Sequence, residues 1–452
     1  MIIQKIRLRN FKCFEELDLD FGKLTILTGA NSSGKSSVIN SLFTTIQSEN
    51  FPFEFSLNGE YVNMGNFEDM VYTHDKTRVV EIGFTIKDNE LYTLDTTWVY
   101  DKVKKLPLFQ KLEVVGEYYS LLISKEVDRR YLVSWKIDRH KFSANKKQFS
   151  DSYEFVTGIL GLLSLQIPDS HKKGENSEVI RFQKSIEKDH KNIEFYIDDL
   201  ANLESTIRKK GSAIMWTIFT RFNKAFVRYE EYVNYISSFR LNPQKFKFEV
   251  ARSKFKVGKY GEKYEDQILD WEYRNSDKFK ELISILKGLK LLDNIKIDRV
   301  VGGSYETKVK THYQGVYAPL TDVGFGVNQF LPIIVADLQL SKGSTLFISQ
   351  PEVHLHPSIQ SDFGGYVANQ VSKNQKRYVI ETHSEYFLNK IRLLIVKGLL
   401  KTDDVKVYFF DKNKNKVTPH ALDFLSNGVI ANAPPDFFAT YMTDVMDIAL
   451  NA

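Results

Sequence analysis

The sequence contains a single cysteine, Cys13, among 452 residues, which excludes a disulfide framework and a cysteine-rich metal site. It has no apolar run near the roughly 18 residues that a membrane-spanning helix needs. The first residues, MIIQKIRLRNF, alternate apolar and charged side chains instead of forming the apolar block of a signal peptide. We therefore expect a cytoplasmic protein without a membrane partner.

Neither sign of charge dominates the chain. The formal net charge of +5 permits nucleic acid as a partner but does not favour it. The sequence also lacks internal repeats, low-complexity tracts and a sustained heptad pattern. Apolar content of 42% and charged content of 26% are ordinary for a soluble globular protein. A chain of this length has room for about two or three domain-sized units.

Hydrophobic periodicity predicts an α/β pattern at both ends of the chain. Near the N-terminus, the strand-like stretch KLTILTG is followed by a helix over 35–47. After residue 320 helices alternate with strands; the helices are expected at 327–340, from 358 and at 384–399, and the strands are TLFIS, RYVIET and VKVYFF. Between the ends we expect a β meander from about residue 78, a mostly helical region over 151–235, a helix over 277–292 and a further β stretch.

The simplest organisation is one α/β domain that is split by a large insertion. We expect residues 1–75 and 293–452 to form the two halves of this domain. Residues 76–292 would be the insertion, with its β meander and helical region.

A phosphate-binding motif follows the third predicted strand. The stretch from Gly29 to Ser36, GANSSGKS, fits G-x-x-x-x-G-K-[ST] between a buried strand and an amphipathic helix. Its backbone N–H groups can form a nest for phosphate oxygens, with Lys35 on the β- and γ-phosphates and the Ser36 hydroxyl on Mg²⁺. The predicted nucleotide-binding residues here are Gly29, Asn31, Ser32, Ser33, Gly34, Lys35, Ser36 and Ser37. The sequence thus predicts that ATP and Mg²⁺ bind here.

Three later stretches narrow the class of ATPase. DVGFGVNQFLPII places glycines at the start of an apolar helix, QPEVHLHP follows one predicted strand, and ETHS ends the next. With LRNFKCFEELDLDF and YVNMGNFEDMV, these stretches resemble stand-alone ABC-type ATPases of the SMC, RecF and OLD branch. They are most similar to the AAA-labelled ATPases of bacterial anti-phage defence operons, such as the Septu ATPase. The resemblance covers about 1–75 and 230–452, and we identify no motif of a known family in residues 76–230.

This resemblance implies an ABC-type P-loop ATPase head, a mixed sheet with flanking helices. It implies that Asp322, Gly324 and Gly326 form the signature motif, which contacts ATP bound to the other subunit, and hence a homodimer or a higher homo-oligomer. It also implies that His383 is the switch histidine. The resemblance implies two further nucleotide contacts. One is made by Lys12, at the end of the segment from Arg9 to Lys12. The other is made by Asn66, in the segment 63–69 that stands where the family has its glutamine-loop.

The sequence departs from the family at the hydrolytic end of the site. The family usually has a Walker B carboxylate and then a glutamate or glutamine before Pro-Glu, but here these two positions are Ser349 and Gln350. A serine is not an anion, and a glutamine amide is not a general base. We keep Gln350, Glu352 and His383 as the candidate catalytic residues, and we expect hydrolysis to be weak.

Two other patterns have ordinary structural explanations. Residues 244–263 alternate basic and aromatic side chains, which could bind nucleic acid but favour a half-buried hairpin with its aromatic residues in the core. His354 and His356 lack the partners of a zinc site.

Three functions remain open from the sequence. The first is a dimeric, ATP-gated switch that controls an effector, a nuclease or a toxin encoded nearby, in anti-phage defence. The second is a RecF- or SMC-like ATPase that acts on DNA in repair or maintenance. The third, a small-molecule kinase, does not explain the DVGFGVNQ and ETHS stretches.

Overall fold

The computed structural model describes residues 1–88, 90–126, 130–137, 193–210, 213–248, 256–300, 302–413, 416–434 and 437. Contacts divide the chain into two compact units that are interleaved along the sequence. The first unit contains residues 1–20 and 40–231, and the second contains residues 21–39 and 232–452. The sequence instead predicted three successive segments, and their boundaries remain a prediction. Helix α1 (Lys35–Ile46) begins in the second unit and ends in the first.

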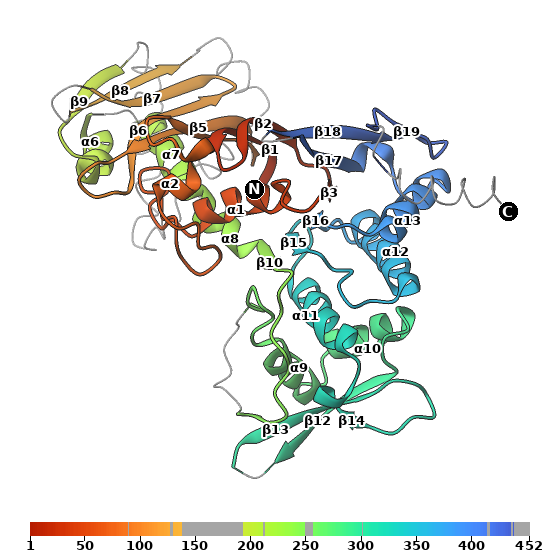
Figure 1. The fold of residues 1–452 in the computed structure, drawn as a ribbon. Helices are drawn as coiled ribbons and strands as arrows, with labels where there is room; N and C mark the ends of the chain where they lie inside the picture. Colours follow the sequence, from red (N-terminus) through yellow and green to blue (C-terminus); the bar gives the residue numbers. More distant parts are fainter. Residues whose placement is uncertain are drawn as a thin grey trace, which may run out of the picture. The chain divides into compact units, whose positions relative to one another are not determined.

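The first unit contains an antiparallel eight-stranded sheet (Figure 1). In spatial order its strands are β2 (Phe14–Asp20), β1 (Ile2–Phe11), β4 (Val80–Lys87), β5 (Leu91–Tyr100), β6 (Pro107–Gly116), β7 (Tyr119–Lys125), β8 (Tyr131–Ile137) and β9 (Ile193–Ile197). Besides the end of α1, its described helices are α2 (Phe67–Met70), α6 (Leu203–Lys210), α7 (Ala213–Asn223) and α8 (Ala225–Glu231). The predicted β meander therefore continues the N-terminal strands in one sheet.

Aromatic side chains fill the core between this sheet and its helices. Phe84 and Trp98 are fully buried, and the Phe226 ring of α8 lies 5.1 Å from the Phe84 ring. The region predicted to be helical over 151–235 is helical in α6, α7 and α8, but residues 193–197 form strand β9 and residues 233–235 belong to a strand of the second unit. This correction has a simple cause: IEFYI alternates exposed and buried residues with period two and pairs with β8. Residues 151–192 of the predicted region lie outside the described part of the chain.

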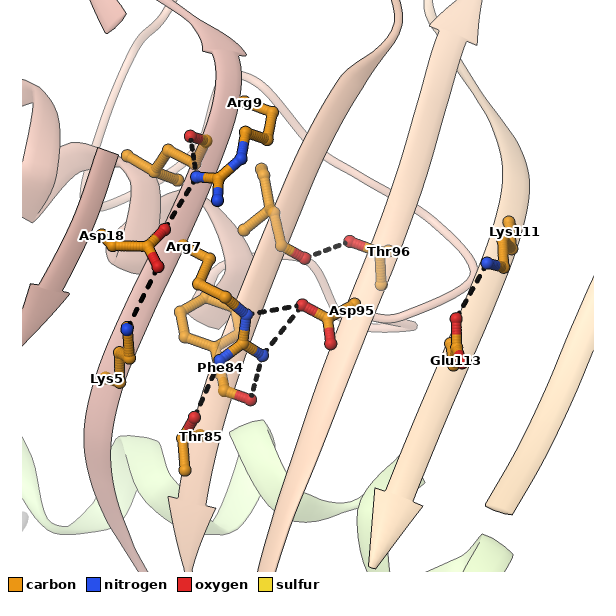
Figure 2. A network of polar contacts seen from close by, with 12 residues as sticks. Lys5, Arg7, Arg9, Asp18, Phe84, Thr85, Asp95, Thr96, Lys111 and Glu113 are labelled. Atoms are coloured by element: carbon orange, nitrogen blue, oxygen red, sulfur yellow. Dashed lines mark hydrogen bonds and ion pairs between the residues drawn. The ribbon is translucent and has the colours of Figure 1, made fainter. Parts of the chain in front are cut away.

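The opposite face of this sheet carries a network of charged side chains (Figure 2). Arg7 of β1 donates to Asp95 of β5 at 2.9 Å, across the intervening strand β4. The residue of β4 between them in register is Gly83. A Cβ atom at position 83 would lie 1.9 Å from the Asp95 carboxylate, so the ion pair can span the strand because this residue has no side chain.

We expect Gly83→Ala to destabilise the first unit by about 1 kcal/mol, because Asp95 must rotate away from Arg7. The measurement is urea unfolding followed by tryptophan fluorescence, to which the buried Trp98 and Trp135 of this unit contribute. In an Asp95→Ala background the same substitution should cost much less, since the displaced carboxylate is already absent and only the Arg7 side chain, 3.0 Å from the new Cβ atom, must shift. Equal losses in both backgrounds would contradict this explanation. Gly288→Ala is the matched control, because open space surrounds Gly288.

The second unit is built on a seven-stranded mixed sheet. Its order is β10 (Val233–Ile236), β15 (Thr345–Ser349), β16 (Arg377–Glu381), β3 (Leu24–Gly29), β17 (Val405–Asn413), β18 (Lys416–Phe424) and β19 (Ile430–Ala431). The first five strands are parallel, and β18 and β19 add antiparallel strands at one edge. The central strands β3 and β15 are buried along their whole length, as expected for a parallel sheet covered on both faces.

In the described part of the second unit this sheet is accompanied by the start of α1 and by α9 (Tyr264–Tyr273), α10 (Asp277–Gly288), α11 (Phe325–Gln339), α12 (Pro357–Lys373) and α13 (Glu385–Val396). Helices α12 and α13 lie side by side (Figure 1). The helices predicted at 35–47, 277–292, 327–340, from 358 and at 384–399 are all present, with ends shifted by a few residues. The predicted α/β class, with a mixed sheet and flanking helices, is confirmed. No described helix is long and apolar enough to cross a membrane.

A small antiparallel sheet completes the second unit. It contains β11 (Lys247–Phe248), β13 (Ser304–Lys310), β12 (Asn294–Val300) and β14 (Ala318–Pro319). The prediction that the aromatic residues of 244–263 lie in the core is wrong for Phe246 and Phe248, which are 50% and 74% exposed. Lys247 instead faces inward and forms an ion pair with the buried Glu265 at 2.8 Å. The ion pair with the buried Glu265 therefore turns Lys247 inward and leaves its aromatic neighbours Phe246 and Phe248 exposed, the reverse of the predicted orientation.

Candidate functional site

The predicted phosphate-binding loop connects β3 to α1 in the second unit, and two of its glycines have positive φ angles. Gly29 has φ +127°, and a Cβ atom there would lie 2.2 Å from the Phe410 carbonyl oxygen of β17. Gly34 has φ +87° immediately before α1 begins at Lys35. Residues with side chains avoid these conformations. Both glycines are thus required by the turn that presents the helix N-terminus.

The other loop residues differ in exposure. Asn31, Ser32 and Ser36 are exposed, whereas Ser33 is buried. Ser32 adopts a left-handed conformation with φ +56°, and the Ser37 amide donates to the Gly34 carbonyl at 2.9 Å. The loop therefore has the alternation of backbone conformations that turns successive N–H groups toward one side.

The Lys35 side chain folds back over its own loop. Its Nζ donates to the Gly29 carbonyl at 3.1 Å, to the Ala30 carbonyl at 2.7 Å and to Ser33 Oγ at 3.4 Å. Burial lowers the pKa of the Lys35 ammonium, and the negative charges of Glu381 and Glu352 oppose that shift. An ammonium held close to a glycine-rich loop at a helix N-terminus is well placed to bind phosphate.

A carboxylate that the sequence analysis did not select contacts the end of this loop. Glu381, the last residue of β16, accepts hydrogen bonds from Ser36 Oγ through both carboxylate oxygens, at 2.8 and 2.9 Å. It also accepts from Ser349 Oγ at 3.0 Å. The register explains the contact, because Glu381 pairs with Ser349 of β15 and with Leu27 of β3. Its position at the carboxyl end of a parallel strand was the available sequence signal.

The turn after β15 positions Gln350. Its amide donates to the Glu381 carbonyl at 2.7 Å, and its backbone is left-handed with φ +48°. Arg240, which is buried, donates to the carbonyls of Ser349 at 2.8 Å and Gln350 at 3.3 Å. Burial lowers the pKa of Arg240 to about 10, opposed by the charge of Glu352. Arg240, which the sequence analysis also missed, fixes the backbone of this turn.

Glu352 is held against the start of the next segment. Its carboxylate accepts from Thr382 Oγ1 at 2.8 Å and from the His383 amide at 2.7 Å. Burial raises the pKa of Glu352, and these hydrogen bonds oppose the shift. His383 as a whole is exposed, but partial desolvation of its imidazole, together with the charge of Lys35, lowers the pKa of this ring. The structure thus brings Gln350, Glu352 and His383 together, at the ends of β15 and β16.

The predicted signature residues lie at the start of α11. Gly324 is the N-cap of this helix, and nothing lies within 4 Å of the position that a Cβ atom would occupy. Gly326 differs, because a Cβ atom there would lie 2.5 Å from the His354 carbonyl oxygen. Asp322 accepts from the neighbouring Thr321 hydroxyl at 3.0 Å. None of these contacts involves the phosphate-binding loop.

Lys12 and Asn66 belong to the first unit, and the structure brings their segments together there. The Lys12 amide donates to the Met70 carbonyl at 2.6 Å, and its Nζ donates to the Met64 carbonyl at 3.3 Å. Asn66 is the N-cap of α2, where its side chain accepts from the Asp69 amide at 3.1 Å. Capping accounts for the asparagine at this position; a nucleotide contact by either residue remains a prediction.

The two histidines after β15 have structural contacts. The His354 ring meets the Phe325 ring edge-on at 4.7 Å, and the His356 side chain caps α12 by accepting from the Ser358 amide. Among the described residues, no group of three or more histidine, cysteine or acidic side chains is arranged to hold a metal ion.

Comparison with known proteins gives a family for this chain. Among the solved structures similar to the chain is the Smc head domain from Pyrococcus furiosus bound to the C-terminal domain of ScpA (10% identity, 99% of each chain covered, TM-score 0.42). Another is the SMC head domain from Thermotoga maritima (8% identity, 93% of this chain and 98% of that chain covered, TM-score 0.36). A third is an Smc head bound to the C-winged helix domain of ScpA (10% identity, 94% of this chain and 98% of that chain covered, TM-score 0.38). No curated protein matches the chain in sequence. Residues 1–388 match the family described as the AAA ATPase domain, so the chain belongs to this family of ATPases.

Proposed function

We propose that this protein is an ATP-binding switch that hydrolyses ATP slowly and controls a partner effector in anti-phage defence. It acts as a homodimer or a higher homo-oligomer, and the effector is a nuclease or a toxin encoded nearby. Membership of the ATPase family supports the use of a nucleotide with Mg²⁺. The resemblance of DVGFGVNQ, QPEVHLHP and ETHS to defence ATPases supports the biological setting.

One contrast within the site carries the proposal of slow turnover. The phosphate-binding half is complete, with Lys35 over its loop and Ser36 at the start of α1. At the hydrolytic end, residue 350 is a glutamine, and the Glu352 carboxylate already accepts two hydrogen bonds from the segment after β16. Such a site binds a nucleotide tightly but has no carboxylate placed to act as the general base that activates water. The long-lived state is then the ATP-bound one.

We expect the unmodified protein to turn over well below about 1 s⁻¹, under the usual range of enzymes. Gln350→Glu should raise turnover about a hundredfold, because it supplies a carboxylate where general-base catalysis is missing. Steady-state phosphate release measures both proteins. Gln375→Glu is the matched control, since Gln375 is exposed and is also left-handed, with φ +54°. Fast turnover in the unmodified protein, or no gain from Gln350→Glu, would contradict the assignment.

The biological role is tested by purifying the tagged protein together with the product of the neighbouring gene. Retention of that product in the presence of ATP, and its loss on washing without nucleotide, would support control of an effector. Turnover stimulated by DNA with no retained partner would instead favour the DNA-maintenance alternative.

A further inference from the structure

Glu381 is a buried carboxylate whose contacts are all with neutral groups. It is 4% exposed, and its oxygens accept from the hydroxyls of Ser36 and Ser349. No ion pair among the described residues includes Glu381; the nearby Lys35 ammonium donates to its own loop. A buried carboxylate is costly unless a cation or several hydrogen bonds compensate its charge. Hydroxyl groups and the charge of the neighbouring Lys35 compensate Glu381 in part, but no cation among the described residues contacts its carboxylate directly.

The location of this carboxylate matches what Mg²⁺ requires beside a nucleotide. Mg²⁺ is usually bound by one or two protein oxygen ligands together with substrate phosphates, so it needs no cage of several acids. Glu381 touches the hydroxyl of Ser36, the residue that follows the phosphate-binding lysine. A serine hydroxyl and a carboxylate at the end of a phosphate-binding loop form a donor set of this kind.

The strand order explains how Glu381 replaces the acid that is missing at position 349. Strand β16 lies between β15 and β3, and Glu381 is in register with Ser349 on one side and with Leu27 on the other. Its carboxylate thus reaches both the end of β15 and the start of α1. Ser349 is small and uncharged, and its hydroxyl donates to Glu381 instead of competing with it.

We propose that Glu381, from the neighbouring strand, is the carboxylate that organises Mg²⁺ with the ATP bound at the Ser36 hydroxyl, and that Ser349 orients it. This inference rests on the proposed ATP binding and deepens it. It separates the two defects that the sequence suggested. In this proposal the carboxylate that organises the cation comes from β16 instead of β15, whereas position 350 has no general base.

The test compares the affinity for a fluorescent ATP analogue with and without Mg²⁺. In the unmodified protein Mg²⁺ should tighten binding, and Glu381→Gln should remove about 10–100-fold of that gain. Affinity in EDTA should not fall, because the phosphate-binding loop is intact. The exchange variant, Ser349→Glu combined with Glu381→Ser, should recover the gain by supplying the acid from β15. Glu385→Gln, four residues further on in the first turn of α13, is the matched control.

A second readout is independent of affinity for the nucleotide. With ATP present, Mn²⁺ should bind to the unmodified protein and to the exchange variant but weakly to Glu381→Gln, as measured by the electron paramagnetic resonance of free Mn²⁺. An equal gain from Mg²⁺ in the unmodified protein and Glu381→Gln would overturn the assignment of Glu381. Failure of the unmodified protein to bind the analogue in either buffer would overturn the proposed function itself. A melting temperature close to that of the unmodified protein shows that each variant is folded.

Discussion

Lys35→Ala is expected to weaken the binding of ATP by at least about a hundredfold. Each hydrogen bond from a charged group is worth about 1.5–3 kcal/mol, and two such contacts with phosphate oxygens correspond to a factor of a hundred or more. In the present structure the same ammonium donates to the Gly29 and Ala30 carbonyls. These contacts hold Lys35 above the loop, so little rearrangement is needed when phosphates arrive. The measurement is a titration with an ATP analogue in the presence of Mg²⁺.

Because Lys35 also braces the loop, its loss could act through the fold. Lys35→Met separates the two effects, since it keeps the length and packing of the side chain but removes the charge. It should lose affinity as Lys35→Ala does while melting close to the unmodified protein. Lys342→Ala, at an exposed lysine of the same unit, is the control for a change in net charge. Near-normal affinity in Lys35→Met would show that the lysine does not contact the phosphates.

Gly324→Arg is expected to abolish ATP-dependent dimerisation while leaving ATP binding by the single subunit intact. The resemblance implies that this turn contacts the nucleotide of the other subunit, and an arginine there would obstruct the approach of that subunit. Open space surrounds the Cβ position of Gly324, so the subunit itself can accept the side chain. Light scattering with and without ATP measures the mass of the assembly.

The neighbouring glycine is a poor probe of the same contact. A side chain at Gly326 would collide with the His354 carbonyl at 2.5 Å and would disturb the subunit before any partner arrives. Gly288→Arg is the control for adding an arginine at a surface glycine away from the signature turn, because open space surrounds Gly288 as it does Gly324. If Gly324→Arg still forms a dimer when ATP is added, the signature turn does not complete the second site.

The sequence predicted the loop but not the carboxylate that meets it. The motif from Gly29 to Ser36 is local, because a strand, a nest and a helix N-terminus follow one another along the chain. Glu381 reaches Ser36 only through the order of strands in the sheet, and nothing in the local pattern of RYVIET places β16 between β15 and β3. The missing acid at position 349 was visible in the sequence. The replacement could have been sought at the end of the next parallel strand.

The fold shows the same limit. Helices and parallel strands with a strong period were predicted well, because burial on a regular face determines both their sequence and their structure. The exposure of Phe246 and Phe248 was not predicted, because it depends on the ion pair with Glu265 that turns Lys247, the residue between them, inward. Strand β9 was assigned to a helical region because the helical periodicity of the residues that follow it dominated the prediction over 151–235, although IEFYI alternates with period two.

The order of strands in the second unit also has a consequence for synthesis on the ribosome. Strand β3 leads into the phosphate-binding loop, but both of its hydrogen-bonded neighbours, β16 and β17, are made about 350 residues or more later. At about 5–20 residues per second, translation takes roughly 20 to 70 s to supply them. Until then, the buried strand LTILTG has no sheet to join. Nascent chains that end before residue 377 should therefore fail to retain ATP, so the nucleotide can be captured only by a nearly complete polypeptide.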